Sequence, residues 1–275
     1  MLYLSDLDFT LLRSDLTLSD FTKRVWNKAA NKEKLSVATA RSLTGVRELL
    51  KGLELKEPLI LLDGAIIATI DGKILHSAVL NKELGNEIIK LAKSEVGLEP
   101  LIVAQGDEAE EFIYPKNLNK YQKELLETMK NRNRIFTAQD FYAKDKNIKM
   151  VFMGDEKPTA HLEKALKAKF GDAIEIKRSK DPYMDCYFMT ILDPKGDKAH
   201  ALAKLEEIED VSIENTTVFG DSYNDIGMFK LAKTKVAVAN AVDELKKLAT
   251  IVLKESNDED AVAKYLARDL YIKVL

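Results

Sequence analysis

Two carboxylates stand close together near the N-terminus, in the stretch LYLSDLDFTLL that spans residues 2–12. An apolar run ends at Ser5, and Asp6 and Asp8 follow it with one residue between them. Alternate residues of an extended chain point to the same side, so this spacing would hold both acids on one face for chemistry. The alternative is an ordinary strand end that runs into a loop, where aspartate is common. The elements around the pair decide between the two.

Strands and helices alternate in the first and last thirds of the chain. The expected strands are continuous apolar runs, as in a parallel sheet covered on both faces. They span residues 2–5, 34–39, 58–63, 216–221, 235–240 and 249–254. Helices are expected over 20–32 after a Ser19 cap, 46–53 after a Ser42 cap, 199–209, 224–232, 242–249 and 258–275. The Asp71-Gly72 pair predicts a hairpin turn within 66–77.

The middle of the chain does not follow this regular alternation of strands and helices. Predicted helices over 82–95, 120–130 and 159–170 are mixed with strand pairs. We therefore expect an α/β fold with a doubly wound, mostly parallel, Rossmann-like sheet, and an inserted α+β domain. The expected core comprises residues 1–80 and 190–275, and the insertion comprises 81–189.

Nearly every core strand delivers a polar group at its carboxyl end, where ligands bind in an open parallel sheet. These groups are Asp6, Asp8, Thr39, Arg41, Asp63, Gly64, Asp221, Asn224, Asp225 and Asn240. Random loop composition would rarely produce this convergence, so Asp6 and Asp8 are predicted to belong to a site. Arg41 and Asp225 are equally explained as first-turn helix charges, and Asn240 as a turn former.

The converging carboxylates come without a cysteine or a histidine at ligand spacing. Such a hard oxygen cluster suits Mg²⁺, which shares its coordination with water and substrate phosphate. The chain has neither a G-x-x-x-x-G-K-[ST] loop nor a G-x-G-x-x-G fingerprint. Metal and carboxylates without a nucleotide cradle favour phosphoryl transfer from a small substrate.

Net charge, hydropathy and cysteine content indicate which classes of partner and which compartment to expect. The 275 residues carry a net charge of −3, so no strong basic field favours nucleic acid or an anionic membrane. No stretch approaches the ~18 apolar residues of a membrane span, and Asp6 interrupts any signal-peptide core. Cys186 is the only cysteine, which fits a reducing compartment. We expect a cytoplasmic protein that binds no nucleic acid and no membrane.

Six short motifs occur in one order along the chain: DLDFT (6–10), TAR (39–41), DGA (63–65), KAHAL (198–202), GDSYND (220–225) and VANA (238–241). Together they resemble the haloacid dehalogenase superfamily, specifically its Cof-type phosphatase branch with an α/β cap between the second and third motifs. The likeness covers both core segments, whereas the cap is matched only by position and texture.

The resemblance implies a role for each matching residue. Asp6 would be the nucleophile that forms an aspartyl-phosphate, and Asp8 would protonate the leaving group and then activate water. Thr39 and Lys198 would bind phosphate, and Thr10 would steady the turn. The implied Mg²⁺ ligands are Asp6, Asp8 through its backbone carbonyl, Asp221 and Asp225, with Arg41, Asp63, Gly64 and Asn224 in supporting or substrate-binding positions.

Some positions depart from the family pattern. Phe9 replaces a glycine common in the first motif, Ala40 replaces a glycine before Arg41, and Asp63 stands where asparagine is usual. Lys195 competes with Lys198 for the third-motif role, and the spacing to the following helix favours Lys198.

The predicted function is a Mg²⁺-dependent phosphatase acting on a small phosphorylated metabolite, such as a sugar phosphate. A phosphomutase is the nearest alternative, and a phospho-aspartate signalling receiver is a more distant one. The stretch RSKDPYMD (178–185) offers Arg178, Lys180 and Tyr183 to a substrate, or is an ordinary surface turn. Neither the substrate nor the oligomeric state, monomer or dimer, follows from the sequence.

Overall fold

A computed structural model describes residues 1–106, 110–128, 135–137, 141–181 and 184–273. The chain divides into two compact units, one formed by Met1–Ser77 with Lys195–Leu275 and the other by Ala78–Pro194. Each unit is described by itself below.

The first unit is built on a parallel sheet with the strand order β14-β13-β12-β1-β2. Its strands are β1 (Leu2–Ser5), β2 (Lys34–Val37), β12 (Thr216–Gly220), β13 (Thr234–Ala237) and β14 (Ile251–Val252). β1 is an interior strand and fully buried, and it pairs in parallel with the middle strand β12 and the edge strand β2. The expected α/β fold is therefore confirmed, and the apolar composition of β1 follows from cover on both faces.

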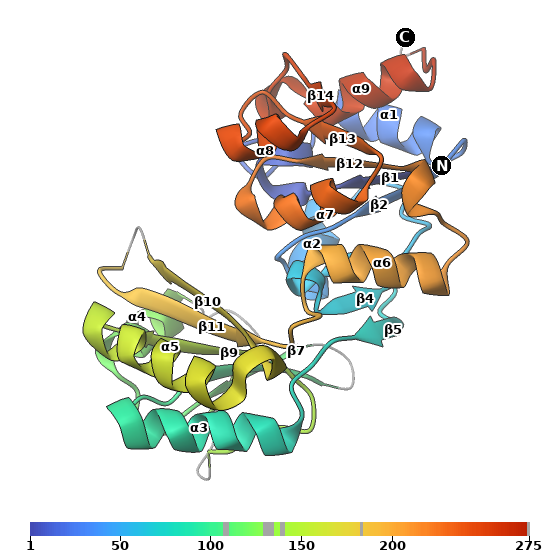
Figure 1. Cartoon of the computed structure of the whole chain (residues 1–275). Helices are drawn as coiled ribbons and strands as arrows, with labels where there is room; N and C mark the ends of the chain where they lie inside the picture. The colour runs from blue at the N-terminus through green and yellow to red at the C-terminus, as the bar shows by residue number, and fades with distance from the viewer. Residues whose placement is uncertain (107–109, 129–134, 138–140, 182–183, 274–275) are drawn as a thin grey trace. The chain divides into compact units, whose positions relative to one another are not determined.

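Helices flank this sheet: α1 (Asp20–Ala29), α2 (Leu43–Leu49), α6 (Lys198–Ile208), α7 (Ile226–Leu231), α8 (Asp243–Leu248) and α9 (Ala261–Asp269). α1 packs on α9, and α6 packs on α7, on the opposite side of the sheet in Figure 1. The predicted caps are confirmed, because Ser19 accepts a hydrogen bond from the Thr22 amide and Ser42 accepts one from the Gly45 amide. The last helix ends at Asp269, well before the predicted end at residue 275, and Tyr271 has a left-handed φ of 51°.

The third predicted core strand takes a different place. β3 (Leu59–Leu61) pairs antiparallel with β4 (Ile66–Ala68), which pairs with β5 (Ile74–Ser77). A single parallel bridge, Ala38 to Ile60, joins β3 to the end of β2. The hairpin around Asp71-Gly72 is confirmed, and its strands provide the partners that make β3 part of an antiparallel sheet.

The second unit contains a mostly antiparallel sheet with the order β10-β11-β9-β6-β7-β8. Its strands are β6 (Leu101–Gln105), β7 (Glu110–Tyr114), β8 (Ile135–Thr137), β9 (Asn147–Gly154), β10 (Glu175–Lys180) and β11 (Tyr187–Leu192). Its helices are α3 (Lys82–Val96), α4 (Lys120–Thr128) and α5 (Glu156–Phe170). β9 alternates between two cores: Met150 and Phe152 join the cluster under α3 and α5, and Val151 and Met153 join the other.

The unit boundaries differ slightly from the expected 80/81 and 189/190. β11 pairs with both β10 and β9, so the chain leaves the second unit only after Pro194. Leu80 exchanges backbone hydrogen bonds with Asn147, which places it in the second unit too. Arg178 and Lys180 lie in β10 instead of a loop.

Short turns complete the chain: η1 (Leu7–Leu11), η2 (Leu62–Gly64), η3 (Gly171–Ala173), η4 (Ile213–Asn215), η5 (Tyr223–Asp225) and η6 (Asn257–Glu259). η1 is a π-helical turn, and the others are 3-10 turns. Among the described residues, no helix combines the length and apolarity that crossing a membrane requires.

Candidate active site

The first two acids are positioned by a tight turn at the end of β1. The chain leaves the strand after Ser5, and η1 begins at Leu7 with Asp8 at φ −70°, ψ 132° and Phe9 at φ 56°. The sequence suggested that alternation along a strand would hold Asp6 and Asp8 on one face. The two acids are instead placed by this turn. The Asn240 side-chain amide donates to the Phe9 carbonyl at 2.8 Å and holds this turn.

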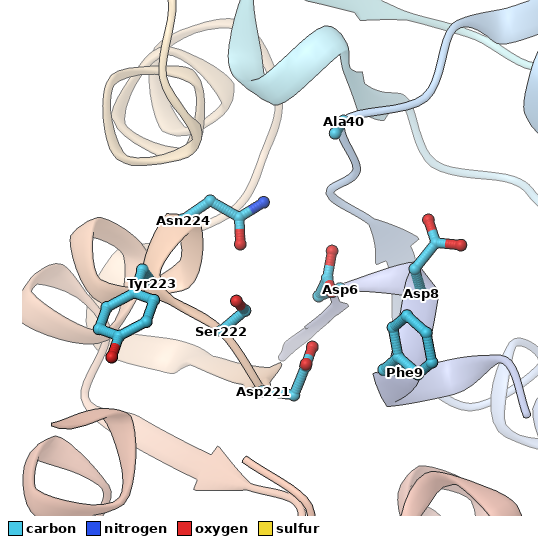
Figure 2. Close-up of a pocket in the computed structure, with 8 residues that line it drawn as sticks. All are labelled: Asp6, Asp8, Phe9, Ala40, Asp221, Ser222, Tyr223 and Asn224. Atoms are coloured by element: carbon cyan, nitrogen blue, oxygen red, sulfur yellow. The ribbon is translucent and has the colours of Figure 1, made fainter. Parts of the chain in front are cut away.

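A cavity of about 400 Å³ opens beside this turn, at the carboxyl ends of the strands. The residues that line it come from the three loops after β1, β2 and β12 (Figure 2), and they are Asp6, Asp8, Phe9, Ala40, Asp221, Ser222, Tyr223 and Asn224. Four of them, Asp6, Asp8, Asp221 and Asn224, were predicted as site residues. Ser222 and Tyr223 were not, although they lie inside the GDSYND motif whose acids were recognised.

Lys198 forms the centre of the site's charge network. Its Nζ donates to Asp6 Oδ1 at 2.5 Å and to Asp225 Oδ1 at 2.8 Å, and its side chain is 1% exposed. A charge this deeply buried is costly unless it is paired, and here two carboxylates pair it. Lys195 is exposed, so Lys198 is the lysine at the site.

The start of α6 is brought to the site by an unusually close backbone approach. Asp197 caps α6 by accepting a hydrogen bond from the His200 amide. A Cβ on Gly64 would lie 2.1 Å from the Asp197 carbonyl carbon, and Gly64 has a φ of +113°. Only glycine fits this contact, so Gly64 supports the position of Lys198 through the backbone. Asp63, beside it, accepts a hydrogen bond from the Asn224 amide group at 3.2 Å.

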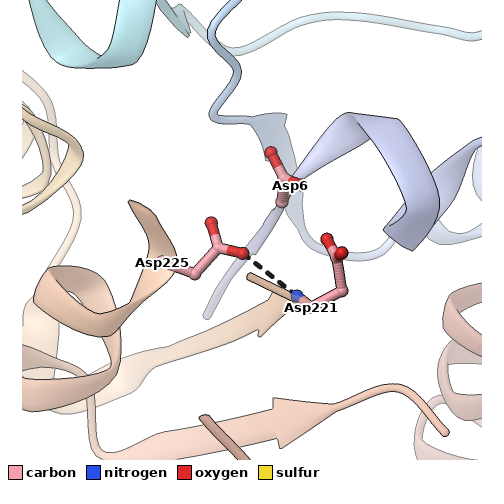
Figure 3. A group of neighbouring side chains, drawn as sticks. All are labelled: Asp6, Asp221 and Asp225. Carbon is pink, nitrogen blue, oxygen red and sulfur yellow. Dashed lines mark hydrogen bonds between the residues drawn. The ribbon is translucent and has the colours of Figure 1, made fainter. Parts of the chain in front are cut away.

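Asp221 and Asp225 follow β12 and are ordered by hydrogen bonds. Asp225 Oδ2 accepts from the backbone amides of Asp221 at 3.0 Å and Ser222 at 3.1 Å, and the first of these bonds is drawn in Figure 3. Because its Oδ1 is engaged by Lys198, both oxygens of Asp225 already have donors. Thr10 donates its hydroxyl to Asp221 Oδ1 at 2.8 Å. Asp225 is thus placed as a group that positions its neighbours.

Gly220 makes room for this arrangement. A Cβ at that position would lie 2.6 Å from Asp225 Oδ2 and 2.8 Å from Asp225 Cβ. Real Cβ atoms do not approach other atoms so closely, so the buried Asp225 side chain depends on a glycine at the end of β12. The glycine of the GDSYND motif therefore has a packing reason as well as a place in the pattern.

The electrostatics of the site favour a cation. Burial raises the pKa of Asp6 well above its usual range, and the nearby Asp225 and Asp221 add to this against the opposing effect of Lys198. Burial also raises the pKa of Asp221. Burial alone would lower the pKa of Lys198, but Asp6 and Asp225 raise it overall, so the lysine is charged. One oxygen from each of the three acids lies within 4.8 Å of the others, a spacing that suits a metal ion.

Asp8 has a different partner. Arg41 donates two hydrogen bonds to the Asp8 carboxylate, from Nε to Oδ2 at 2.8 Å and from Nη2 to Oδ1 at 2.5 Å. Its carboxylate side chain is 28% exposed, so the pair lies at the margin of the site. The sequence explained Arg41 equally well as a site residue or as a charge in the first turn of a helix. Its contact with Asp8 places it at the site.

Thr39 is buried and does not line the cavity. Its Oγ1 accepts a hydrogen bond from the Arg41 amide at 3.1 Å, and its own amide donates to the Ile60 carbonyl at 2.9 Å. In this structure Thr39 joins the loop after β2 to β3, one residue before the cavity-lining Ala40.

Two of the three predicted substrate residues of the second unit, Arg178 and Lys180, lie in separate ion pairs. Arg178 donates to Glu163 of α5 at 2.7 Å and lies over the Tyr187 ring at 4.9 Å. Lys180 pairs with the exposed Asp185 at 3.2 Å. Tyr183 lies outside the described residues.

Acids at the strand ends of a parallel α/β sheet, with a buried lysine against the first of them, form a site suited to phosphate chemistry. A family model described as haloacid dehalogenase-like hydrolase matches residues 3–266. The chain belongs to this family, and it is a phosphatase, a hydrolase acting on phosphoric monoesters.

Individual relatives agree with this assignment. The chain is 27% identical over 283 residues to a 5-amino-6-(5-phospho-D-ribitylamino)uracil phosphatase of Bacillus subtilis (strain 168), with 95% of each chain covered. A second protein of that organism with the same named activity is 27% identical over 267 residues, covering 94% of this chain and 91% of the relative. A haloacid dehalogenase-like hydrolase from Bacteroides thetaiotaomicron has a TM-score of 0.77, 26% identity and 98% coverage of both chains.

Proposed function

We propose that the protein is a Mg²⁺-dependent phosphatase that hydrolyses a small phosphorylated metabolite through an aspartyl-phosphate on Asp6. The observation that carries the proposal is the contact of the buried Lys198 Nζ with Oδ1 of the cavity-lining Asp6 at 2.5 Å. The buried ammonium keeps a carboxylate available beside a space where a phosphate can enter, and it offsets charge on the transferred group.

The proposed reaction has two displacements at phosphorus. Asp6 attacks through a carboxylate oxygen, so that its bond to phosphorus forms while the bond to the leaving oxygen breaks. Asp8 gives its proton to the departing alkoxide and then takes a proton from water. That water attacks phosphorus, the bond to Asp6 breaks, and inorganic phosphate leaves. Arg41 would orient Asp8 between these two steps.

Mg²⁺ fits the residues that are present. Lys198 donates to one oxygen of Asp6 and Thr10 donates to one oxygen of Asp221, and both carboxylates face the cluster shown in Figure 3. When bound, Mg²⁺ would offset the negative charge of the acids and of the substrate phosphate. Asp6 and Asp221 would hold it, and Asp225 would keep the Asp221 loop in place.

The substrate class is proposed from the relatives. Two proteins similar over more than nine-tenths of this chain are named for a phosphate ester of a ribityl-substituted uracil. A sugar phosphate, or a similar phosphomonoester of a small polyol, is therefore the proposed substrate. We also propose that residues 78–194 act as the cap domain and that the protein works in the cytoplasm.

The test is phosphate release by purified protein from a panel of phosphomonoesters, with Mg²⁺, with EDTA, and with Mg²⁺ restored. We expect turnover only with Mg²⁺. Thermal unfolding gives an independent readout, because Mg²⁺ that binds the folded acids must raise the Tm as the Mg²⁺ concentration rises above its Kd. Asp221→Asn should abolish that rise. Turnover in metal-free protein, or a Tm that Mg²⁺ does not move, would contradict the metal proposal.

A further inference from the structure

Phe9 exposes a large apolar ring in the wall of the active-site cavity. Its neighbours Leu7, Thr10 and Leu11 are buried, whereas Phe9 is 49% exposed and lines the cavity. Burial therefore does not explain why an aromatic residue stands here.

The backbone at Phe9 also disfavours this residue. Its φ of 56° and ψ of 11° lie in the left-handed region, which glycine adopts freely and a bulky side chain adopts only with strain. The hydrogen bond from Asn240 to the Phe9 carbonyl keeps the backbone in that conformation. Leu16 shares the positive φ but does not line the cavity, so it is the combination of strain and exposure in the cavity that points to a function for the Phe9 ring.

A second aromatic ring lines the same cavity. Tyr223 is 60% exposed, and its hydroxyl donates to Glu244 Oε2 at 3.3 Å, which steadies the ring. In Figure 2, Phe9 and Tyr223 lie on opposite sides of Asp6 and Asp221. A phosphate attacked by Asp6 would therefore carry its leaving group out between two aromatic walls.

We propose that Phe9 selects phosphomonoesters whose leaving group carries a flat aromatic or heteroaromatic ring, with Tyr223 as the opposite wall. Aromatic rings attract one another in offset or edge-to-face arrangements beyond what their buried area contributes, whereas a puckered ring lacks the π-face for this contact. The inference rests on the proposed function, because it takes Asp6 as the attacking group.

The experiment compares benzyl phosphate with cyclohexylmethyl phosphate. The two esters have similar size and similar leaving alkoxides, and they differ in whether the ring is flat. We expect Phe9→Gly to lower kcat/KM for benzyl phosphate about three- to tenfold relative to that for cyclohexylmethyl phosphate. The variant should fold, because glycine fits the left-handed backbone at this position.

Leu16→Gly is the matched control. Leu16 also has a positive φ, of 65°, and is 37% exposed, but it does not line the cavity. It should leave the benzyl to cyclohexylmethyl ratio unchanged. An equal effect of Phe9→Gly on both esters, or no effect on either, would overturn the inference alone. Absence of any turnover of these esters and of p-nitrophenyl phosphate by the Mg²⁺-loaded wild type would instead overturn the proposed function, and the inference with it.

Discussion

The strand ends of the first unit and the β10 edge of the second unit both gather charged side chains, but under different conditions. Lys198 is 1% exposed and lies between two buried carboxylates. Lys180 is 60% exposed, and its partner Asp185 is 95% exposed. A buried charge costs several kcal/mol of desolvation unless it is paired, whereas an exposed pair contributes little either way. Charge that a protein buries at such a cost is a stronger sign of function than charge left in water.

The same difference appears in the glycines. Gly64 in the first unit lies against the backbone of Asp197, where a Cβ would be 2.1 Å away, whereas Gly97 at the end of α3 has nothing within 4 Å of a Cβ. Both have positive φ, so the conformational demand is shared and the packing demand is not. The turn at Gly64 is thus packed much more closely than the end of α3 at Gly97.

The largest difference between variants of the two regions is expected in turnover. Asp6→Asn keeps the side-chain volume but removes the attacking oxygen, so phosphatase kcat should fall at least roughly 1,000-fold. Glu163→Gln, which removes the carboxylate that pairs with Arg178 in the second unit, should leave turnover of p-nitrophenyl phosphate unchanged. Steady-state kinetics with Mg²⁺ compares the two variants. A wild-type rate in Asp6→Asn would show that the strand ends of the first unit matter no more for turnover than the β10 edge does.

The next effect is on stability. Lys198→Met leaves Asp6 and Asp225 without their shared cation, which should cost about 3–5 kcal/mol of unfolding free energy in metal-free buffer. Lys180→Met removes an exposed partner, and we expect no change in the midpoint of denaturation. Urea unfolding at neutral pH measures both. Equal stability of the two variants would show that the buried ammonium is not what offsets the two acids.

A smaller effect is expected at the glycine pair. Gly97→Ala should cost about 1–2 kcal/mol, the price of a Cβ in the left-handed region. Gly64→Ala meets the same strain and also the Asp197 backbone, which adds about 1–3 kcal/mol and displaces Lys198. Only Gly64→Ala should therefore lower kcat as well. Unfolding and kinetic measurements on both variants separate the two causes, and a Gly64→Ala enzyme with normal kcat would break the link to Lys198.

The smallest effect concerns the margin of the site. Arg41→Met removes the guanidinium that holds the carboxylate of Asp8, and kcat should fall roughly tenfold because the general acid is less well oriented. Arg47→Met is the control, since Arg47 Nε donates to the Ile70 carbonyl at 3.1 Å on the surface. Unchanged kcat in Arg41→Met would mean that Asp8 finds its position without Arg41.

The alternation of apolar strands and helices was enough to predict the fold class, and the polar residues at the strand ends were enough to name the candidate acids. Asp6, Asp8, Asp221 and Asn224 all line the cavity, and Lys198 rather than Lys195 reaches Asp6. These residues lie together because a parallel sheet brings the carboxyl ends of its strands to one edge, and their roles in catalysis stay predictions.

The details of those loops were not predictable from the residues. The phenylalanine itself does not indicate a positive φ at position 9, because local preference assigns glycine to such positions. The glycine that is common at this place in the first motif was the one available signal, and the hydrogen bond from Asn240 holds the backbone of Phe9 in that conformation. The engagement of both Asp225 oxygens depends on backbone amides that a pattern does not locate. Arg178 was read as a loop residue because β10 is exposed and lacks an apolar pattern.

The central claim is that Asp6 becomes covalently phosphorylated, and borohydride reduction of the enzyme during turnover tests it most directly. An acyl phosphate on Asp6 would be reduced to homoserine, whereas a free carboxylate would not react. Trypsin should release the peptide that ends at Arg13, which contains both Asp6 and Asp8, and fragmentation by mass spectrometry distinguishes the two positions. The account predicts homoserine at position 6 only when substrate and Mg²⁺ are both present. Reduction at Asp8 or Asp221, or none during steady turnover, would contradict it.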